Sequence, residues 1–177
     1  MNLIETFQNL VAQVPELVQP LIVALAGAVP FIEGEGAAVI GIIGGIHPVV
    51  AAISAIIGNF LCVLILVLVS SGARNAIVQR NRARRLVAAG GDTGVDAAPA
   101  TEPSSPRKQK FQRALDRYGV PGVSLLGPLL LPTQFTATML AATGVSKARI
   151  LFWQGLAIVA WTTALTVIVG GAVYVIA

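Results

Sequence analysis

The sequence has little charge and very few of the residues that build catalytic or metal centres. Only 11% of its 177 residues are charged, against about 25% in ordinary soluble proteins, and 55% are hydrophobic. A single cysteine, Cys62, and a single histidine, His47, leave no intrachain disulfide, zinc cluster or nucleophile–base pair to assemble. The motifs H-E-x-x-H, G-x-S-x-G and Walker A are missing as well. We therefore expect no enzyme, no cofactor and no metal site, and a mean hydropathy of +0.81 predicts a polytopic membrane protein.

Basic residues are missing from the first 73 positions, since all twelve lie between Arg74 and Arg149. Segment 70–117 holds ten of them against four acidic residues, a net charge of +6, whereas the rest of the chain has two against four, a net charge of −2. The positive-inside rule predicts a cytoplasmic loop from this asymmetry. A surface that binds nucleic acid or anionic lipid headgroups is the less favoured alternative, and we expect no nucleic-acid partner.

The charge pattern divides the chain into a first membrane half (1–69), a basic, flexible cytoplasmic loop (70–117) and a second membrane half (118–177). Within the loop, Arg74–Arg85 is expected to continue a helix. Gly90–Pro106 is rich in Gly, Ala, Pro, Ser and Thr without periodicity, which is typical of a flexible linker.

The first half contains an amphipathic segment, an interrupted apolar segment and a long apolar run. Residues 2–14 have apolar side chains at helical spacing, which predicts a helix in the membrane interface. Leu17–Val29 and Ala37–Ile46 would form helices of about 20 and 15 Å, too short for a hydrocarbon core of about 30 Å. Pro48–Val69 is long enough to cross. A stripe of small or polar residues in this run predicts close helix packing: Ser54, Gly58, Asn59 and Cys62.

The second half repeats this order of elements. Phe111–Tyr118 is a short amphipathic segment, and Val120–Thr143 is apolar but broken at 127–128 and 131–134. Ile150–Ile176 is the last predicted crossing.

The charge rule favours a particular topology for the two broken segments. If both are re-entrant hairpins, Lys147 and Arg149 lie on the cytoplasmic side with the basic loop, whereas full crossings would place them outside. We therefore predict an all-α integral membrane protein with an inverted repeat: two re-entrant helical hairpins, two full transmembrane helices and interfacial amphipathic helices. Breaks at corresponding positions of two repeats are typical of a transporter binding site.

The acidic stretch around the first break is the candidate site. Pro30, Gly34 and Gly36 interrupt the helix, and Glu33 and Glu35 lie at the interruption. A carboxylate near the bilayer midplane costs about 2.5–3.5 kcal/mol on insertion scales, and irregular backbone there must be buried or line a wet cavity. Two neighbouring carboxylates in a low dielectric cannot both ionise cheaply, so we expect one to hold a proton near neutral pH.

The opposing break offers carbonyl, hydroxyl and amide groups, and Asn59 lies in the first crossing. The predicted substrate and proton site consists of Glu33, Glu35, Asn59, Pro132, Thr133 and Gln134. The alternative is that the two acids cap the N-termini of half-helices, where the helix dipole favours an anion. For Trp153 and Trp161, interface anchoring or packing is favoured over a cation-binding pocket, and His47 is expected in a surface turn.

Two stretches carry a resemblance to a known family. They are "PFIEGEGAAVIGIIGGIHPVVAAISAIIGN" and "RYGVPGVSLLGPLLLPTQFTATMLAATGVSKARILFWQ". Over about residues 25–70 and 111–165 the chain resembles the small multidrug export proteins, and its architecture is distantly similar to the DedA/VTT (SNARE-associated Golgi protein) superfamily. The second resemblance implies paired re-entrant segments and lipid or polyprenyl-phosphate translocation. However, that superfamily typically has an arginine in the second broken segment, and Val120–Thr143 has no basic residue.

Together these features predict a small secondary transporter in the bacterial inner membrane that exports cationic or lipophilic compounds in exchange for protons. The alternatives are a DedA-like lipid-carrier translocase and a non-transporting membrane scaffold whose basic loop binds anionic lipid or a cytoplasmic partner. With so few crossings, a closed cavity is expected to need a homodimer.

Overall fold

The computed structural model describes residues 3–89 and 106–176, and all secondary structure within these ranges is helical. The elements are α1 (Leu3–Gln13), α2 (Gln19–Gly27), α3 (Glu33–Ile43), α4 (Pro48–Ala89), α5 (Pro106–Leu126), the 3-10 turn η1 (Gly127–Leu129), α6 (Thr133–Thr143) and α7 (Lys147–Ile176). The prediction of an all-α fold is confirmed for the described residues.

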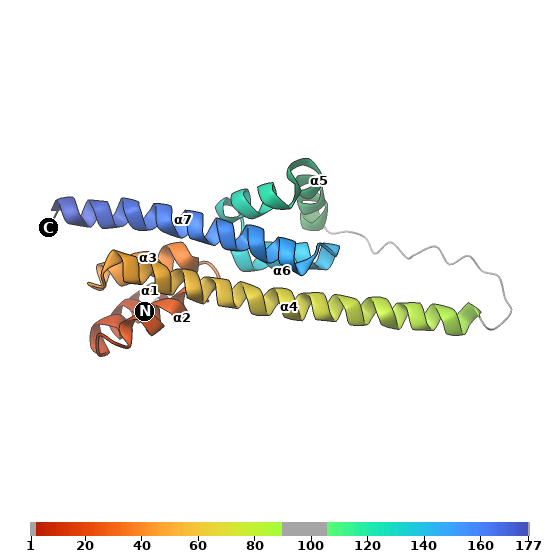
Figure 1. Cartoon of the computed structure of the whole chain (residues 1–177), viewed down its shortest axis with the longest axis horizontal. Helices are drawn as coiled ribbons and strands as arrows, with labels where there is room; N and C mark the ends of the chain where they lie inside the picture. The colour runs from red at the N-terminus through yellow and green to blue at the C-terminus, as the bar shows by residue number, and fades with distance from the viewer. Residues whose placement is uncertain (1–2, 90–105, 177) are drawn as a thin grey trace.

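Two long helices, α4 and α7, form the frame of the molecule. They pack against each other and run in opposite directions (Figure 1). Pro48–Arg84 and Lys147–Val175 are long and apolar enough to cross a membrane. Helix α4 has 42 residues and is therefore about 63 Å long, and it continues well past Val69. The helical extension predicted over Arg74–Arg85 is confirmed as part of α4.

The predicted loop 70–117 is largely helical where it is described. Its first part belongs to α4 and its last part, from Pro106, to α5, while the linker predicted over Gly90–Pro106 lies almost entirely outside the described residues. The boundary drawn at residue 69 therefore falls inside a continuous helix. The reason is that residues 70–89 contain no proline, and a single glycine, Gly72, is tolerated inside a helix, so a change in polarity alone does not end it.

Each predicted broken segment is interrupted between two helices. In the first half, α2 and α3 pack together and are joined by residues 28–32. In the second half, α5, which is kinked at Gly119 with a φ of +65°, leads through η1 into α6. Both breaks lie where proline and glycine predicted them. Helix α3 begins at Glu33, four residues earlier than the apolar run, and so includes both acids in its first turn.

Glycines bring the first hairpin into backbone contact with α4. A Cβ atom at Gly58 would lie 1.8 Å from the carbonyl oxygen of Ala24 in α2, and one at Gly27 would lie 2.7 Å from that of Ala55 in α4. Only glycine allows helices to approach this closely. The packing predicted from the small-residue stripe of α4 is confirmed at Gly58, and it fixes the hairpin along the frame.

The amphipathic helix predicted near the N-terminus is confirmed as α1. Its side chains Phe7 and Val11 pack on the apolar cluster that α2, α3 and α4 form.

Helix α6 is held at its C-terminus by Arg74, whose Nε–H donates to the carbonyl of Ala142 at 3.2 Å. A cation at a helix C-terminus is favourable because it faces the unpaired carbonyls and the negative end of the dipole.

Candidate functional site

The tips of the two hairpins meet through Glu33 and Thr133, which are 100 positions apart in the chain. The carboxylate of Glu33 accepts hydrogen bonds from the backbone N–H and the hydroxyl of Thr133, the second at 2.9 Å. Thr133 is the first residue of α6, so its N–H is one of the donors that an isolated helix leaves unpaired. Glu33 therefore caps a helix, as the alternative reading of the sequence suggested, but the helix belongs to the other half of the chain.

The backbone at the first tip is strained in a way that directs Glu33 towards α6. Phe31 and Glu33 have φ values of +73° and +55°, in the left-handed region that side chains other than glycine rarely adopt. Such a residue costs about 1–3 kcal/mol and persists only where surrounding contacts hold it. For Glu33, which is 7% exposed, these contacts are its burial and the hydrogen bonds to Thr133, and for Phe31 the contact is the one between its ring and that of Phe135 in α6.

A second polar contact joins the two halves of the chain, next to the contact between Glu33 and Thr133. The side-chain amide of Gln134 donates to Oδ1 of Asn59 at 3.1 Å, and both residues are buried. Asn59 comes from α4 and Gln134 from the first turn of α6. The structure thus brings Glu33, Thr133, Gln134 and Asn59, four of the six predicted site residues, together in one place.

The carbonyl oxygen of Pro132, which was expected to face the substrate, is used for hydrogen bonds within the protein. Its carbonyl oxygen accepts the N–H groups of Phe135 and Thr136, at 3.0 and 3.1 Å, and so closes the first turn of α6. The residue itself lines the cavity described next.

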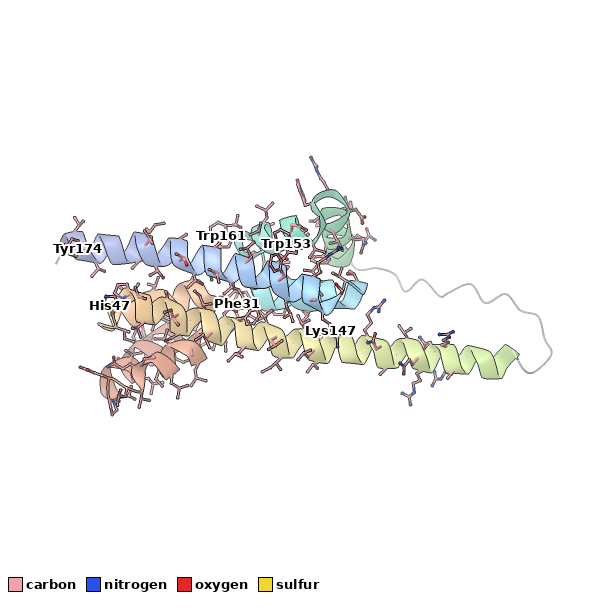
Figure 2. The ribbon with its side chains drawn as sticks, in the orientation of Figure 1. Phe31, His47, Lys147, Trp153, Trp161 and Tyr174 are labelled. Atoms are coloured by element: carbon pink, nitrogen blue, oxygen red, sulfur yellow. The ribbon has the colours of Figure 1, made fainter. Side chains whose placement is uncertain are left out.

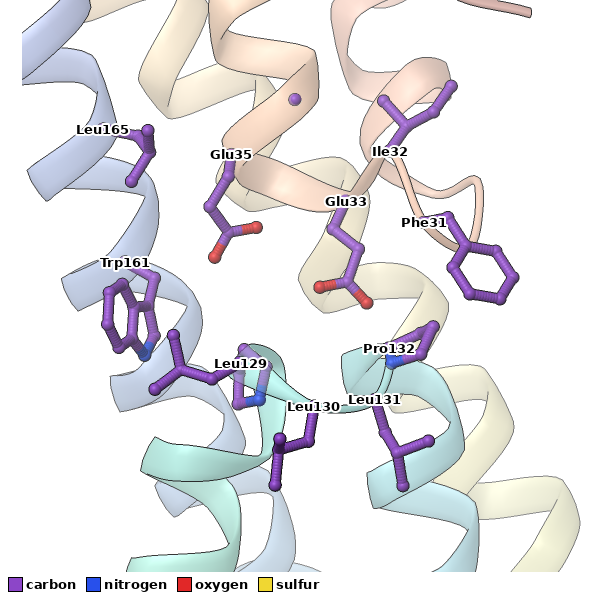
Figure 3. A pocket seen from close by; sticks show the side chains of 12 residues that line it. Phe31, Ile32, Glu33, Glu35, Leu129, Leu130, Leu131, Pro132, Trp161 and Leu165 are labelled. Atoms are coloured by element: carbon purple, nitrogen blue, oxygen red, sulfur yellow. The ribbon is translucent and has the colours of Figure 1, made fainter.

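A cavity of about 480 Å³ lies between the two tips and α7 (Figure 3). Glu35 faces this cavity from the first turn of α3. The volume is in the range of small-molecule sites. Apart from Glu33 and Glu35 the lining is mainly apolar and contains no basic residue: Phe31, Ile32, Gly36, Pro128, Leu129, Leu130, Leu131, Pro132, Trp161 and Leu165.

Trp161 lines the cavity, although interface anchoring or packing was the role that the sequence favoured for it. Its indole N–H donates to the carbonyl of Leu125 at 2.9 Å, which fixes the ring beside the cavity. Figure 3 shows Trp161 and Glu35 on the same side of the space between the hairpins. Trp153, in contrast, packs on the apolar cluster of the second half. Spacing within one helix could not separate the two tryptophans, because only the position of the second hairpin decides which of them faces the acids.

The two glutamates therefore have different surroundings, although they share one helical turn. Glu33 is bound by Thr133 across the halves, and Glu35 faces an apolar, aromatic space whose described lining residues include no basic side chain. An aromatic ring together with a carboxylate is a suitable environment for an organic cation with apolar substituents. Comparisons of the chain with protein families, curated proteins and solved structures found no match.

Proposed function

We propose that this protein is a small secondary transporter of the bacterial inner membrane, which exchanges protons for cationic, lipophilic compounds at the cavity between the hairpins. The single observation that carries the proposal is the composition of the cavity. Two carboxylates and one fixed indole lie in a space that is otherwise mainly apolar and has no basic residue. A monovalent cation with apolar substituents matches this lining, and a proton on a carboxylate is its natural competitor.

Support for the membrane placement comes from how little of the two long helices is covered by protein. In the most apolar 18-residue window of each helix, the buried share is 33% for α4 and 22% for α7. The core helix of a soluble protein is mostly buried. One stripe of α4 is at least 50% exposed at every position: Ile53, Ile57, Leu61 and Ile65. Apolar area of this extent is typical of a surface covered by lipid.

We further propose that the two hairpins are re-entrant and related as an inverted repeat. The element order, with a hairpin followed by a long helix in each half, and the antiparallel course of α4 and α7 support this arrangement. Figure 2 places Lys147 at the opposite end of α7 from Tyr174, and His47 near the end with Tyr174. The end with Lys147 would be cytoplasmic by the positive-inside rule.

The rim of the cavity is consistent with a substrate that arrives through lipid. Phe31 is 80% exposed and Leu130 is 84% exposed, and both line the cavity. Two crossings in each chain are few to enclose such a space, so we propose that a homodimer is the working unit. The lack of a basic residue in the lining argues against the lipid-phosphate translocase, because a phosphate would meet two carboxylates there.

The test is proton movement in proteoliposomes that contain the purified full chain and a pH-sensitive dye. Ethidium is added as the lipophilic cation, and wild type is compared with Glu35→Gln, Glu33→Gln and the exposed control Glu16→Gln. We expect ethidium to drive proton flux in wild type and in Glu16→Gln, and Glu35→Gln to abolish it while far-UV circular dichroism stays unchanged.

Two outcomes would overturn the proposal. One is a folded wild-type protein that moves no protons with ethidium or any other lipophilic cation. The other is a Glu35→Gln variant that remains fully active. Flipping of a lipid phosphate in the same proteoliposomes would support the lipid-carrier translocase instead. Inactivity in both assays would favour a non-transporting membrane scaffold.

A further inference from the structure

Three polar side chains lie buried together behind the tip of the first hairpin. Asn59 of α4, Gln134 of α6 and Thr162 of α7 are 0%, 2% and 0% exposed. They adjoin Glu33 in two ways, since Gln134 follows the Thr133 that binds Glu33, and Gly34, which follows Glu33, packs on Thr162. We call Asn59, Gln134 and Thr162 the polar triad.

Each member of the polar triad has an atom without a hydrogen-bond partner among the described protein atoms. These atoms are Nδ2 of Asn59, Oε1 of Gln134 and Oγ1 of Thr162. The bond between Asn59 and Gln134 uses only one polar atom of each amide. If the oxygen and nitrogen positions were exchanged in both amides, Asn59 would donate to Gln134 instead and the bond between them would remain. One donor and one acceptor of the pair would still be unpaired, so the conclusion holds in either orientation.

Gly34 shows that two of the three unpaired atoms face a common point. A Cβ atom built on Gly34 would lie 2.3 Å from Oγ1 of Thr162 and 3.6 Å from Nδ2 of Asn59. These two atoms are therefore within about 6 Å of each other, a separation that one water molecule with two ordinary hydrogen bonds can bridge.

Four positions away along α4 and α7, the described residues are apolar except Thr166, whose own Oγ1 is also buried without a partner. One helical turn away along α4 and α7, Val63 and Ile158 belong to the apolar cluster of the second half. One turn away in the other direction along α4, Ala55 belongs to the apolar cluster of the first half. Within a bilayer, polar atoms in such a position must be satisfied internally, and a buried water with two to four polar partners is the usual solution.

We infer that the polar triad binds water, and that this water carries protons to and from Glu33. The role in proton transfer rests on the proposed function, whereas the binding of water stands on the buried atoms alone. A proton passes from hydronium to the carboxylate, which leaves water and a carboxylic acid, and the return step is the reverse.

Water-edited solid-state NMR of the full chain in lipid bilayers tests the binding of water directly. Magnetisation from water should reach the side chains of Asn59, Gln134 and Thr162 much faster than the side chains of Leu140 and Ile150, which are buried in the apolar cluster. Transfer to the triad that is as slow as transfer to Leu140 would overturn the inference.

Thr162→Val supplies a second test, with Thr163→Val as the matched control because Thr163 is the exposed neighbour in the same helix. In a dry site, a methyl group in place of an unpaired hydroxyl would leave the unfolding temperature unchanged or raise it. In a hydrated site, the water loses a partner, so Thr162→Val should unfold at a lower temperature than Thr163→Val. An equal or higher unfolding temperature would contradict the inference.

Two further measurements test whether the polar triad binds water or a sodium ion, and whether it takes part in proton transfer. Stabilisation of wild type but not of Thr162→Val by sodium chloride, with no effect of choline chloride, would identify a sodium site and overturn the inference. Proton flux driven by ethidium should be several-fold slower in Thr162→Val than in Thr163→Val. Unchanged flux would refute the role in proton transfer, whereas a wild type without any flux would refute the proposed function and leave the water site standing.

Discussion

The substitution Gly58→Ala tests most directly how the first hairpin is held. Alanine is the better helix former by about 1 kcal/mol, so in an open part of α4 the change should stabilise the protein. At Gly58, however, the new Cβ would lie 1.8 Å from the carbonyl oxygen of Ala24, where real Cβ contacts essentially never fall below 3.0 Å. Helix α2 would have to move by about 1.2 Å, the difference between these two distances.

The magnitude follows from what this movement disturbs. Overpacking usually costs about 1–3 kcal/mol, and here the obstacle is backbone rather than a side chain that can rotate. The contact of Gly27 with Ala55 loosens as well. We expect a net loss of about 2 kcal/mol, and with about 2–4 °C for each kcal/mol in a chain of this size the unfolding temperature should fall by about 4–8 °C.

The assay is thermal unfolding in one detergent, followed by far-UV circular dichroism, with Gly72→Ala as the control in the same helix. No atom lies within 4 Å of the Cβ position at Gly72, so this variant should be at least as stable as wild type. If Gly58→Ala were as stable as Gly72→Ala, α2 would not be in backbone contact with α4, and the placement of the acidic tip that depends on this contact would be refuted.

Three further predictions concern Glu33 and Trp161 of the site, and Arg74 at the far end of α6. Glu33→Ala leaves the buried N–H and hydroxyl of Thr133 without their acceptor and should cost about 2–5 kcal/mol, whereas Glu33→Gln keeps one acceptor and should cost about half as much in the same unfolding assay. Arg74→Ala loses one hydrogen bond to the end of α6 and should cost about 1 kcal/mol, measured against Arg80→Ala, which should be neutral. Trp161→Ala should weaken the binding of ethidium at least tenfold in a fluorescence titration, and unchanged affinity would exclude the indole from the site.

Much of the architecture could be predicted because it depends on properties that are local in the sequence. Hydropathy and length identified α4 and α7, and proline and glycine located both breaks. The end of α4 was not predictable from polarity, because a helix continues into solvent until its sequence provides a stop signal. The pairing of Asn59 with Gln134 was anticipated only to the extent that both residues were assigned to one site; their hydrogen bond depends on how α6 lies against α4.

The sequence by itself determined the class of fold, the two breaks and the concentration of acid at the first of them. These follow from composition and spacing, which act within a few residues. The tertiary structure alone decided that Glu33 caps α6, that Glu35 faces the cavity, and that Trp161 rather than Trp153 lines the cavity. The two acids are chemically identical and two positions apart in the chain. They differ only in what the second half of the protein places opposite them, and that depends on packing between segments about 100 residues apart.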